Sequence, residues 1–254
     1  MGTIDQQRVI QKMDEYMSRR DYAGAERHLL YWLKEARYLS DQRGELLVRG
    51  ELIGHFRKTG NREGAFHQAD EALRLIRELD YDGTIASGTT YVNIATAYDA
   101  FGEEEKSLQM FEKAKEVYEN APSVSPGLLG GLYNNLGLTL VSLGREEEAM
   151  GYYEKAMAQM EKVAGGHLEI AITCLNMADA WQQMLGPEEA EKHTEPLLDR
   201  AYELLQNDSH VDQGYYAFVL EKCAPSFEYY GYFLAAEEFS RRAREIYERK
   251  DGAQ

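Results

Sequence analysis

The sequence has little proline, which breaks helices, and little cysteine, which builds disulfides and metal sites. Five prolines and two cysteines occur in 254 residues. Neither Cys174 nor Cys223 has a Cys or His nearby at metal-ligand spacing, which argues against a structural zinc site. No apolar run approaches the roughly 18 residues of a membrane helix, and the first ten residues lack the apolar stretch of a signal peptide. We therefore expect a cytoplasmic protein with reduced thiols and no membrane partner.

Positive charge is also scarce. The chain has 28 Lys and Arg against 44 Asp and Glu, which gives a formal net charge of -16. Binding to nucleic acid depends on cations that replace the counterions of the phosphates, so this balance argues against a nucleic-acid partner.

The motifs of common catalytic sites are missing as well. The chain contains no HExxH, GxSxG, Walker-type or GxGxxG stretch. Its histidines are scattered among different predicted helices and turns, at His28, His55, His67, His167, His193 and His210. We expect no enzyme, no cofactor and no metal site.

What is abundant favours helices. Apolar residues make up 44% and charged residues 28% of the chain, which is ordinary for a folded protein. Ala, Leu, Glu and Tyr are common, and this composition predicts an all-α fold.

A repeat is visible in the positions of small residues. Gly60, Gly102 and Gly144 are each followed by charged residues, as at the end of one helix and the start of the next. A small residue stands five positions after each of them, and matching positions recur at intervals of about 40 to 46 residues, a period typical of a solenoid. These six anchors are Ala25, Ala65, Ser107, Ala149, Ala190 and Ala236.

Other positions come into register with the anchors. Nine residues before them stand large apolar residues, and twelve residues before them four of the six residues are small enough for close helix contact. Pro196 and Pro225 fall inside predicted helices, where we expect them to kink or interrupt the backbone hydrogen bonding.

The fourth repeat is similar to the tetratricopeptide consensus in Tyr133-Asn134-Asn135-Leu136-Gly137, Leu140, Gly144, Ala149, Tyr153 and Ala156. The chain thus resembles the tetratricopeptide repeat family, in a longer-period form like kinesin light chain-like and bacterial peptide-sensor arrays. The resemblance implies an all-α, right-handed superhelical solenoid of about six antiparallel helix pairs, with the first helix of each pair facing a concave groove. We expect one array over 1–254, with pairs near 5–38, 43–79, 84–120, 126–163, 167–206 and 211–250.

An amide recurs on the predicted groove face. Fourteen residues before the anchors stand Asn93, Asn135 and Asn176, and Glu51 occupies the same position in the second repeat. An amide side chain can pair with both the C=O and the N–H of an extended peptide. The resemblance implies that these three Asn hold a peptide backbone, but Asn at this position could instead bond a neighbouring helix.

The same face is expected to present further side chains around the amides. A charged face of this kind is also compatible with simple solvation. The family's carboxylate clamp for a peptide terminus is a further alternative, although the spacing here does not match it closely. The additional groove candidates are Arg57, Lys58, Thr89, Thr96, Asp99, Asn134, Leu138, Asp179, Gln182, Glu221, Glu228 and Tyr229.

Three functions follow as hypotheses. The first is a non-catalytic scaffold or adaptor that binds a protein or extended peptide segment in the groove. The second is a regulatory sensor of a short signalling peptide, although such receptors usually carry an effector domain before the repeats, whereas the first repeat here begins near Asp5. The third is self-assembly as a homodimer through the array ends, because the apolar side of Phe239, Ala243, Ile246 and Tyr247 is expected to stay partly exposed.

Overall fold

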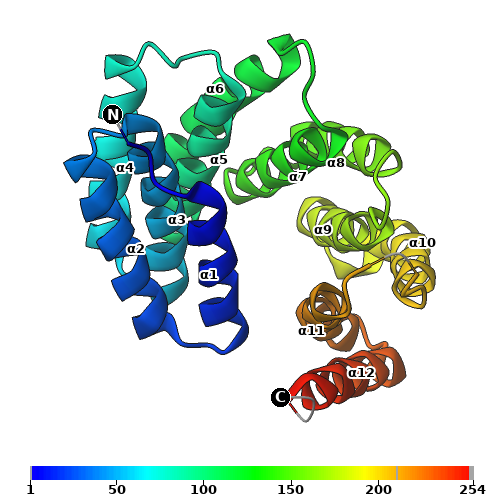
Figure 1. The fold of residues 1–254 in the computed structure, drawn as a ribbon. Coiled ribbons are helices and arrows are strands. Elements are labelled where there is room, and N and C mark those ends of the chain that lie inside the picture. The colour runs from blue at the N-terminus through cyan, green and yellow to red at the C-terminus, as the bar shows by residue number, and fades with distance from the viewer. Residues whose placement is uncertain (1, 210, 252–254) are drawn as a thin grey trace. The chain divides into compact units, whose positions relative to one another are not determined.

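The computed structural model describes residues 2–209 and 211–251, and every regular element in this part of the chain is an α-helix. His210 lies outside the described residues. The chain forms two compact units, residues 1–124 and 125–254, and each unit contains three pairs of helices joined by short turns (Figure 1). The all-α fold of six helix pairs is confirmed.

The N-terminal unit contains the first three pairs. Within it, α3 packs against α4 and also against α5 of the next pair. Its helices are α1 (Gln6–Ser18), α2 (Tyr22–Tyr38), α3 (Gln42–Thr59), α4 (Arg62–Glu78), α5 (Ile85–Ala100) and α6 (Glu104–Asn120).

The C-terminal unit repeats this arrangement. Within it, α9 packs against α10, against the preceding α8 and against α11 of the last pair. Its helices are α7 (Pro126–Ser142), α8 (Glu146–Met160), α9 (His167–Leu185), α10 (Pro187–Leu205), α11 (Gln213–Tyr229) and α12 (Phe233–Asp251).

The turns inside the pairs use the left-handed backbone conformation. Gly60, Gly102 and Gly144 have φ of 75°, 73° and 71°, as the sequence predicts. The first pair has no glycine there, and Arg20 takes a φ of 55° instead. A side chain makes this conformation costly, so glycine is favoured wherever the turn repeats.

Three successive helices begin with the same cap. Asp21, Asp41 and Asn61 each accept a hydrogen bond from the backbone N–H of a glycine three residues later. At Gly24 and Gly44 a Cβ would lie 2.3 Å from the capping carboxylate. The repeated Asp/Asn-x-x-Gly pattern therefore fixes where α2, α3 and α4 begin.

Small residues bring the helices of each pair close together. All six anchors are buried, from Ala25 to Ala236. Gly137 of α7 faces the ring of Tyr153 on α8, where a Cβ would come within 2.3 Å of the ring. The predicted close approach at these positions is confirmed.

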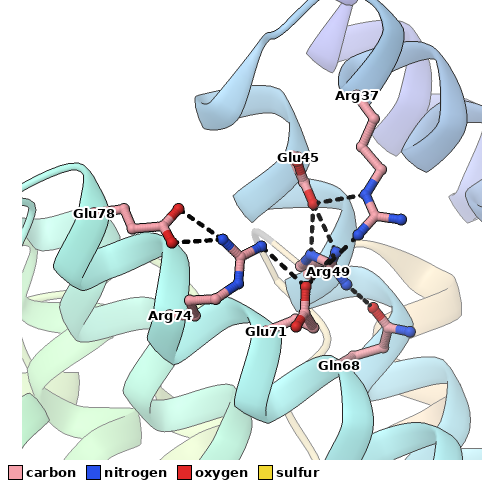
Figure 2. A network of polar contacts seen from close by, with 7 residues as sticks. All are labelled: Arg37, Glu45, Arg49, Gln68, Glu71, Arg74 and Glu78. Carbon is pink, nitrogen blue, oxygen red and sulfur yellow. Dashed lines mark hydrogen bonds and ion pairs between the residues drawn. The ribbon is translucent and has the colours of Figure 1, made fainter.

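A buried ion network joins α2, α3 and α4 (Figure 2). Arg49 is 1% exposed, and its guanidinium lies 2.6 Å from Oε1 of Glu45 and 3.2 Å from Oε2 of Glu71. It also donates to Gln68. Arg37 of α2 lies 3.1 Å from Glu45, so the carboxylate of Glu45 links α2 to α3.

Neither internal proline ends its helix. Helices α10 and α11 continue through Pro196 and Pro225, so the expected interruption is limited to one backbone hydrogen bond at each proline. Each proline lacks an N–H and removes only the bond to the carbonyl four residues earlier, at Lys192 and Glu221. Packing of the flanking turns keeps both helices continuous.

The last pair also differs from expectation. Phe239, Ala243 and Ile246 are buried, and Tyr247 packs against the same core cluster. The prediction that this apolar side stays uncovered was wrong, because α12 turns it toward α11. The exposed apolar residues of α12 lie at its start, where Leu234 is 84% exposed.

Candidate functional site

A groove on the N-terminal unit runs between α3 and α5. Its cavity measures about 440 Å³, and it combines an apolar floor with amide, hydroxyl and charged groups. We call it the N-groove, lined by Gln6, Arg43, Leu46, Leu47, Gly50, Glu51, Tyr81, Ala86, Thr89, Thr90 and Asn93.

Three of the predicted groove residues, Glu51, Thr89 and Asn93, line the N-groove. Glu51 belongs to α3 and follows Gly50, whereas Thr89 and Asn93 belong to α5. A Cβ at position 50 would lie 3.2 Å from Nδ2 of Asn93. The bare backbone of Gly50 thus leaves room around the half-buried amide.

Charge in the N-groove is partly shielded from water. Burial raises the pKa of the Glu51 carboxyl, and the neighbouring Asp14 raises it further. At one edge, the guanidinium of Arg43 lies over the ring of Tyr81, 5.1 Å from its centroid. The groove therefore offers a weakened acid, an amide and a cation in one recess.

The other predicted residues of this unit lie outside the N-groove lining. Arg57 lies near the end of α3, where partial desolvation of its guanidinium lowers its pKa. Thr96 donates to the carbonyl of Asn93 at 3.0 Å, so its hydroxyl is used within its own helix. Asp99 lies half-buried one turn further along α5.

In the C-terminal unit the predicted amides have different surroundings. Asn176 of α9 donates to Oδ1 of Asn134 on α7 at 3.0 Å, and Thr173 donates to the same oxygen at 3.0 Å. Asn134 is itself buried. Asn135 is half-buried, and Leu138 is 40% exposed on the same helix.

A second recess lies where α9, α10 and the α11–α12 turn meet. Two adjoining cavities of about 560 and 530 Å³ share Gln182, Pro187, Tyr229 and Tyr230. We call it the C-groove, lined by Asp179, Gln182, Gln183, Pro187, Glu191, Thr194, Glu195, Leu198, Pro225, Ser226, Tyr229, Tyr230, Gly231 and Tyr232.

Tyrosine hydroxyls connect α11 to α9 at the C-groove. Gln182 donates to the hydroxyl of Tyr229 at 2.6 Å, and Tyr230 donates to Oδ1 of Asp179 at 2.8 Å. Burial raises the pKa of Asp179, while the bond from Tyr230 opposes that shift. The three predicted residues in this recess, Asp179, Gln182 and Tyr229, are thus each bonded to a side chain of the neighbouring helix.

Sequence reasoning missed several groove residues. Gly50 and Tyr81 of the N-groove, and Glu191, Glu195 and Tyr230 of the C-groove, were not among the candidates. The spacing of Glu191 and Glu195, one helical turn apart, was the available signal for a shared face of the second helix.

Within residues 2–209 and 211–251, no group of three or more His, Cys, Asp or Glu side chains is placed to hold a metal ion. In the same residues, no helix has both the length and the hydropathy needed to cross a bilayer.

The repeat register agrees with a known family model. A model described as tetratricopeptide repeat matches residues 88–121 and 130–168, which begin in α5 and α7. No curated protein sequence matches the chain.

Solved structures share the fold. BtubC (BKLC) from P. vanneervenii is 20% identical over 92% of both chains, with a TM-score of 0.60. The apo form of RapI is 16% identical over 98% of this chain and 85% of its own, with a TM-score of 0.67. NprR in complex with its cognate peptide NprX is 16% identical over 95% of this chain and 68% of its own, with a TM-score of 0.60. Identities this low establish the fold alone.

The helix pairs, the buried small residues at their crossings and the matched repeats agree with one another. The third and fourth helix pairs carry tetratricopeptide repeats, and these are the repeats that match the family model.

Proposed function

We propose that the protein is a non-catalytic adaptor that binds an extended segment of a polypeptide in the N-groove. The observation that carries this proposal is that Glu51 and Asn93 line one cavity, with the Asn93 amide close to the bare backbone of Gly50. The amide of Asn93 offers a donor and an acceptor for a peptide backbone, whose N–H and C=O groups need such partners once water is excluded.

The floor of the N-groove suits the side chains of such a segment. Leu46 is buried and Leu47 is half-buried, and Ala86 adds apolar surface beside them. Apolar contact of this kind supplies affinity, while the few polar groups fix direction and register. Arg43 and Glu51 place opposite charges in the same groove, which gives a bound segment a preferred orientation.

The likeness to NprR supports a peptide ligand. NprR has the same fold and was solved with its cognate peptide NprX. We carry over only the class of ligand, because the identity of 16% transfers no residue.

The state of the thiols supports a non-catalytic role in a reducing cytosol. Cys174 and Cys223 are free and buried. Burial raises the pKa of Cys174 and raises that of Cys223 to about 12, so both stay protonated near neutral pH. A protonated buried thiol is a poor nucleophile.

The test begins with a library of random peptides displayed on phage and selected on the purified protein. A selected peptide is then titrated by fluorescence polarisation against wild type, Asn93→Ala and Gly50→Ala. Gly50→Ala should fold well, because Ala favours a helix over Gly by roughly 1 kcal/mol, yet its methyl group crowds the Asn93 amide. We expect both variants to weaken binding at least roughly tenfold, the loss of one or two backbone hydrogen bonds.

The matched control is Asn120→Ala, which removes an exposed amide of α6 that bonds only the carbonyl of Glu116 in its own helix. Its affinity should equal that of wild type. Undiminished binding by folded Asn93→Ala and Gly50→Ala would rule out the N-groove as the binding site.

A sensor of a short free peptide is the second candidate, and the likeness to NprR, which was solved with its cognate peptide, favours it. The two functions differ in whether the ligand needs free ends. Acetylating and amidating the selected peptide should leave its affinity unchanged for an adaptor, and should reduce it strongly for a sensor that recognises a terminus.

A further inference from the structure

The C-groove has an unusual composition. Its lining contains three tyrosines, at 229, 230 and 232, and three carboxylates, at Asp179, Glu191 and Glu195, with no Lys or Arg among the lining residues. Helix α9 has no Lys or Arg at all, and α11 has only Lys222, which does not line the cavities.

The exposed glutamates of this recess lie on α10, whose Lys192 and Arg200 do not line the cavities. Glu191 and Glu195 are exposed, lie one turn apart on α10, and form no ion pair with any described residue. Asp179 is instead held by the hydroxyl of Tyr230. The two glutamates therefore remain available to a ligand.

An exposed aromatic face lies beside these carboxylates. Tyr229 is 69% exposed, although its hydroxyl accepts a hydrogen bond from Gln182. Its ring stands at 86° to that of Tyr230, with centroids 5.1 Å apart. Aromatic faces attract cations through their quadrupole, and the attraction grows where water is partly excluded.

Pro225 and Pro187 complete the apolar wall of the recess. A long side chain with an apolar stem and a charged end matches this combination, because the stem packs on proline and tyrosine while the head reaches the carboxylates. Lys and Arg are the residues with that build.

We propose that the C-groove binds a Lys or Arg side chain of a polypeptide ligand, with Glu191 and Glu195 pairing the charge and Tyr229 covering the cation. The polypeptide context rests on the proposed function, but recognition of the cation does not depend on the N-groove. The chain's net charge of -16 would also speed the encounter with a basic segment.

The experiment uses fluorescein-labelled decapeptides of Gly, Ser and Ala that differ only in two central residues, which are Arg, Lys, Met or Glu. Each peptide is titrated by fluorescence polarisation against the full chain at low and high salt. We expect the Arg and Lys peptides to bind about tenfold tighter than the Met peptide, with the preference weakening as salt rises. Equal binding of the Met and Arg peptides would show an apolar groove and overturn the proposal, as would no binding of any peptide.

Variants show which residues give the preference for Arg and Lys peptides over the Met peptide. Glu191→Gln/Glu195→Gln and Tyr229→Ala should each abolish most of it, whereas Tyr229→Phe keeps the ring and should keep the preference. Glu105→Gln/Glu116→Gln changes the net charge by the same amount on exposed α6 and should have no effect. If this control weakens the Arg peptide as much as the α10 pair does, attraction is non-specific and the C-groove is not the site.

One variant separates this proposal from the proposed function. Gly50→Ala alters the N-groove only, so it should leave the preference for Arg over Met intact. Loss of selected-peptide binding in Gly50→Ala with an intact Arg preference supports both proposals. If Gly50→Ala changes neither the binding of the selected peptide nor the Arg preference, the proposed function fails and the C-groove proposal is still supported.

Discussion

The amide of Asn176 on α9 donates to the side-chain oxygen of Asn134 on α7 across 3.0 Å. Thr173 donates to the same oxygen, so Asn134 accepts from two groups of the neighbouring pair. At this position the repeated Asn bonds an adjacent helix, which is one of the two roles predicted from the sequence. Asn93 instead lines the N-groove beside Gly50, which suits the other predicted role, the binding of a peptide backbone.

This difference predicts unequal effects on stability. Asn134→Ala leaves the Asn176 amide and the Thr173 hydroxyl without their shared acceptor, and should lower the free energy of unfolding by about 1–3 kcal/mol. Asn93→Ala should lower it by less than about 0.5 kcal/mol, since its amide faces the groove. Urea unfolding followed by circular dichroism measures both, and equal losses would contradict the assignment.

The buried ion network makes a second prediction. Arg49→Ala leaves Glu45 and Gln68 facing an empty buried site, and should cost about 3–5 kcal/mol in the free energy of unfolding. Arg49→Met together with Glu45→Leu removes both charges and keeps the volume, so it should be much closer to wild type. Thermal unfolding compares them with Arg74→Ala, an exposed member of the network that should change little.

Two results would contradict this prediction. One is an Arg49→Ala variant as stable as wild type, and the other is a double variant less stable than Arg49→Ala.

Acid should destabilise the N-terminal unit through His55. The ring is 2% exposed, its nitrogens form no hydrogen bond with any residue that the structure describes, and burial lowers its pKa, although Glu26 at 3.7 Å opposes this. The unfolded chain takes up the proton near its ordinary pKa of about 6.5, before the folded chain does. The contribution of His55 to the free energy of unfolding is therefore constant above that pH. It falls as the pH drops from there toward the folded pKa, and it levels off below the folded pKa.

Melting temperatures measured between pH 7.5 and 5 check this sign. His55→Gln should flatten the decline relative to wild type, whereas His67→Gln, at an exposed position, should leave it unchanged. A wild-type protein that became more stable on acidification in this range, or an unaltered decline in His55→Gln, would refute the role given to His55.

Pro196 supplies a fourth prediction. Pro196→Ala restores an N–H that can bond the carbonyl of Lys192 inside α10, and should raise the free energy of unfolding by about 1–2 kcal/mol after the entropy returned to the unfolded chain. Pro187→Ala at the first turn of the same helix should bring no such gain, because no bond is missing there. Chemical denaturation of the two variants decides this, and a destabilised Pro196→Ala would mean that the proline ring packs favourably.

The helix pairs were predictable because their signals are local. Gly60, Gly102 and Gly144 mark turns that need positive φ, and small anchors mark helix crossings, so the predicted pairs lie within a few residues of the observed ones. Pro225 interrupts one backbone hydrogen bond, as predicted, but the continuation of α11 beyond it depends on tertiary packing, which sequence reasoning cannot weigh.

The site was less predictable because it depends on which neighbour fills a space. Asn93 and Asn176 hold equivalent repeat positions, yet of these two it is Asn176 that bonds a buried Asn, on α7 of the preceding pair. The pairing of Arg49 with Glu45 has ordinary helical spacing, which is typical of solvated pairs as well as buried ones. The C-groove is formed by residues of three helices, α9, α10 and α11, and no local sequence pattern predicts that these residues lie together.

The most direct test of the central claim observes the Asn93 side chain itself. In a ¹⁵N-labelled protein, the side-chain amide signals of Asn93 are assigned by their absence from Asn93→Ala, and those of Asn120 in the same way. On saturation with a selected peptide, the account predicts that the Asn93 signals shift and gain protection from exchange with water, while the Asn120 signals do not move. Unchanged Asn93 signals in a fully bound protein would contradict it.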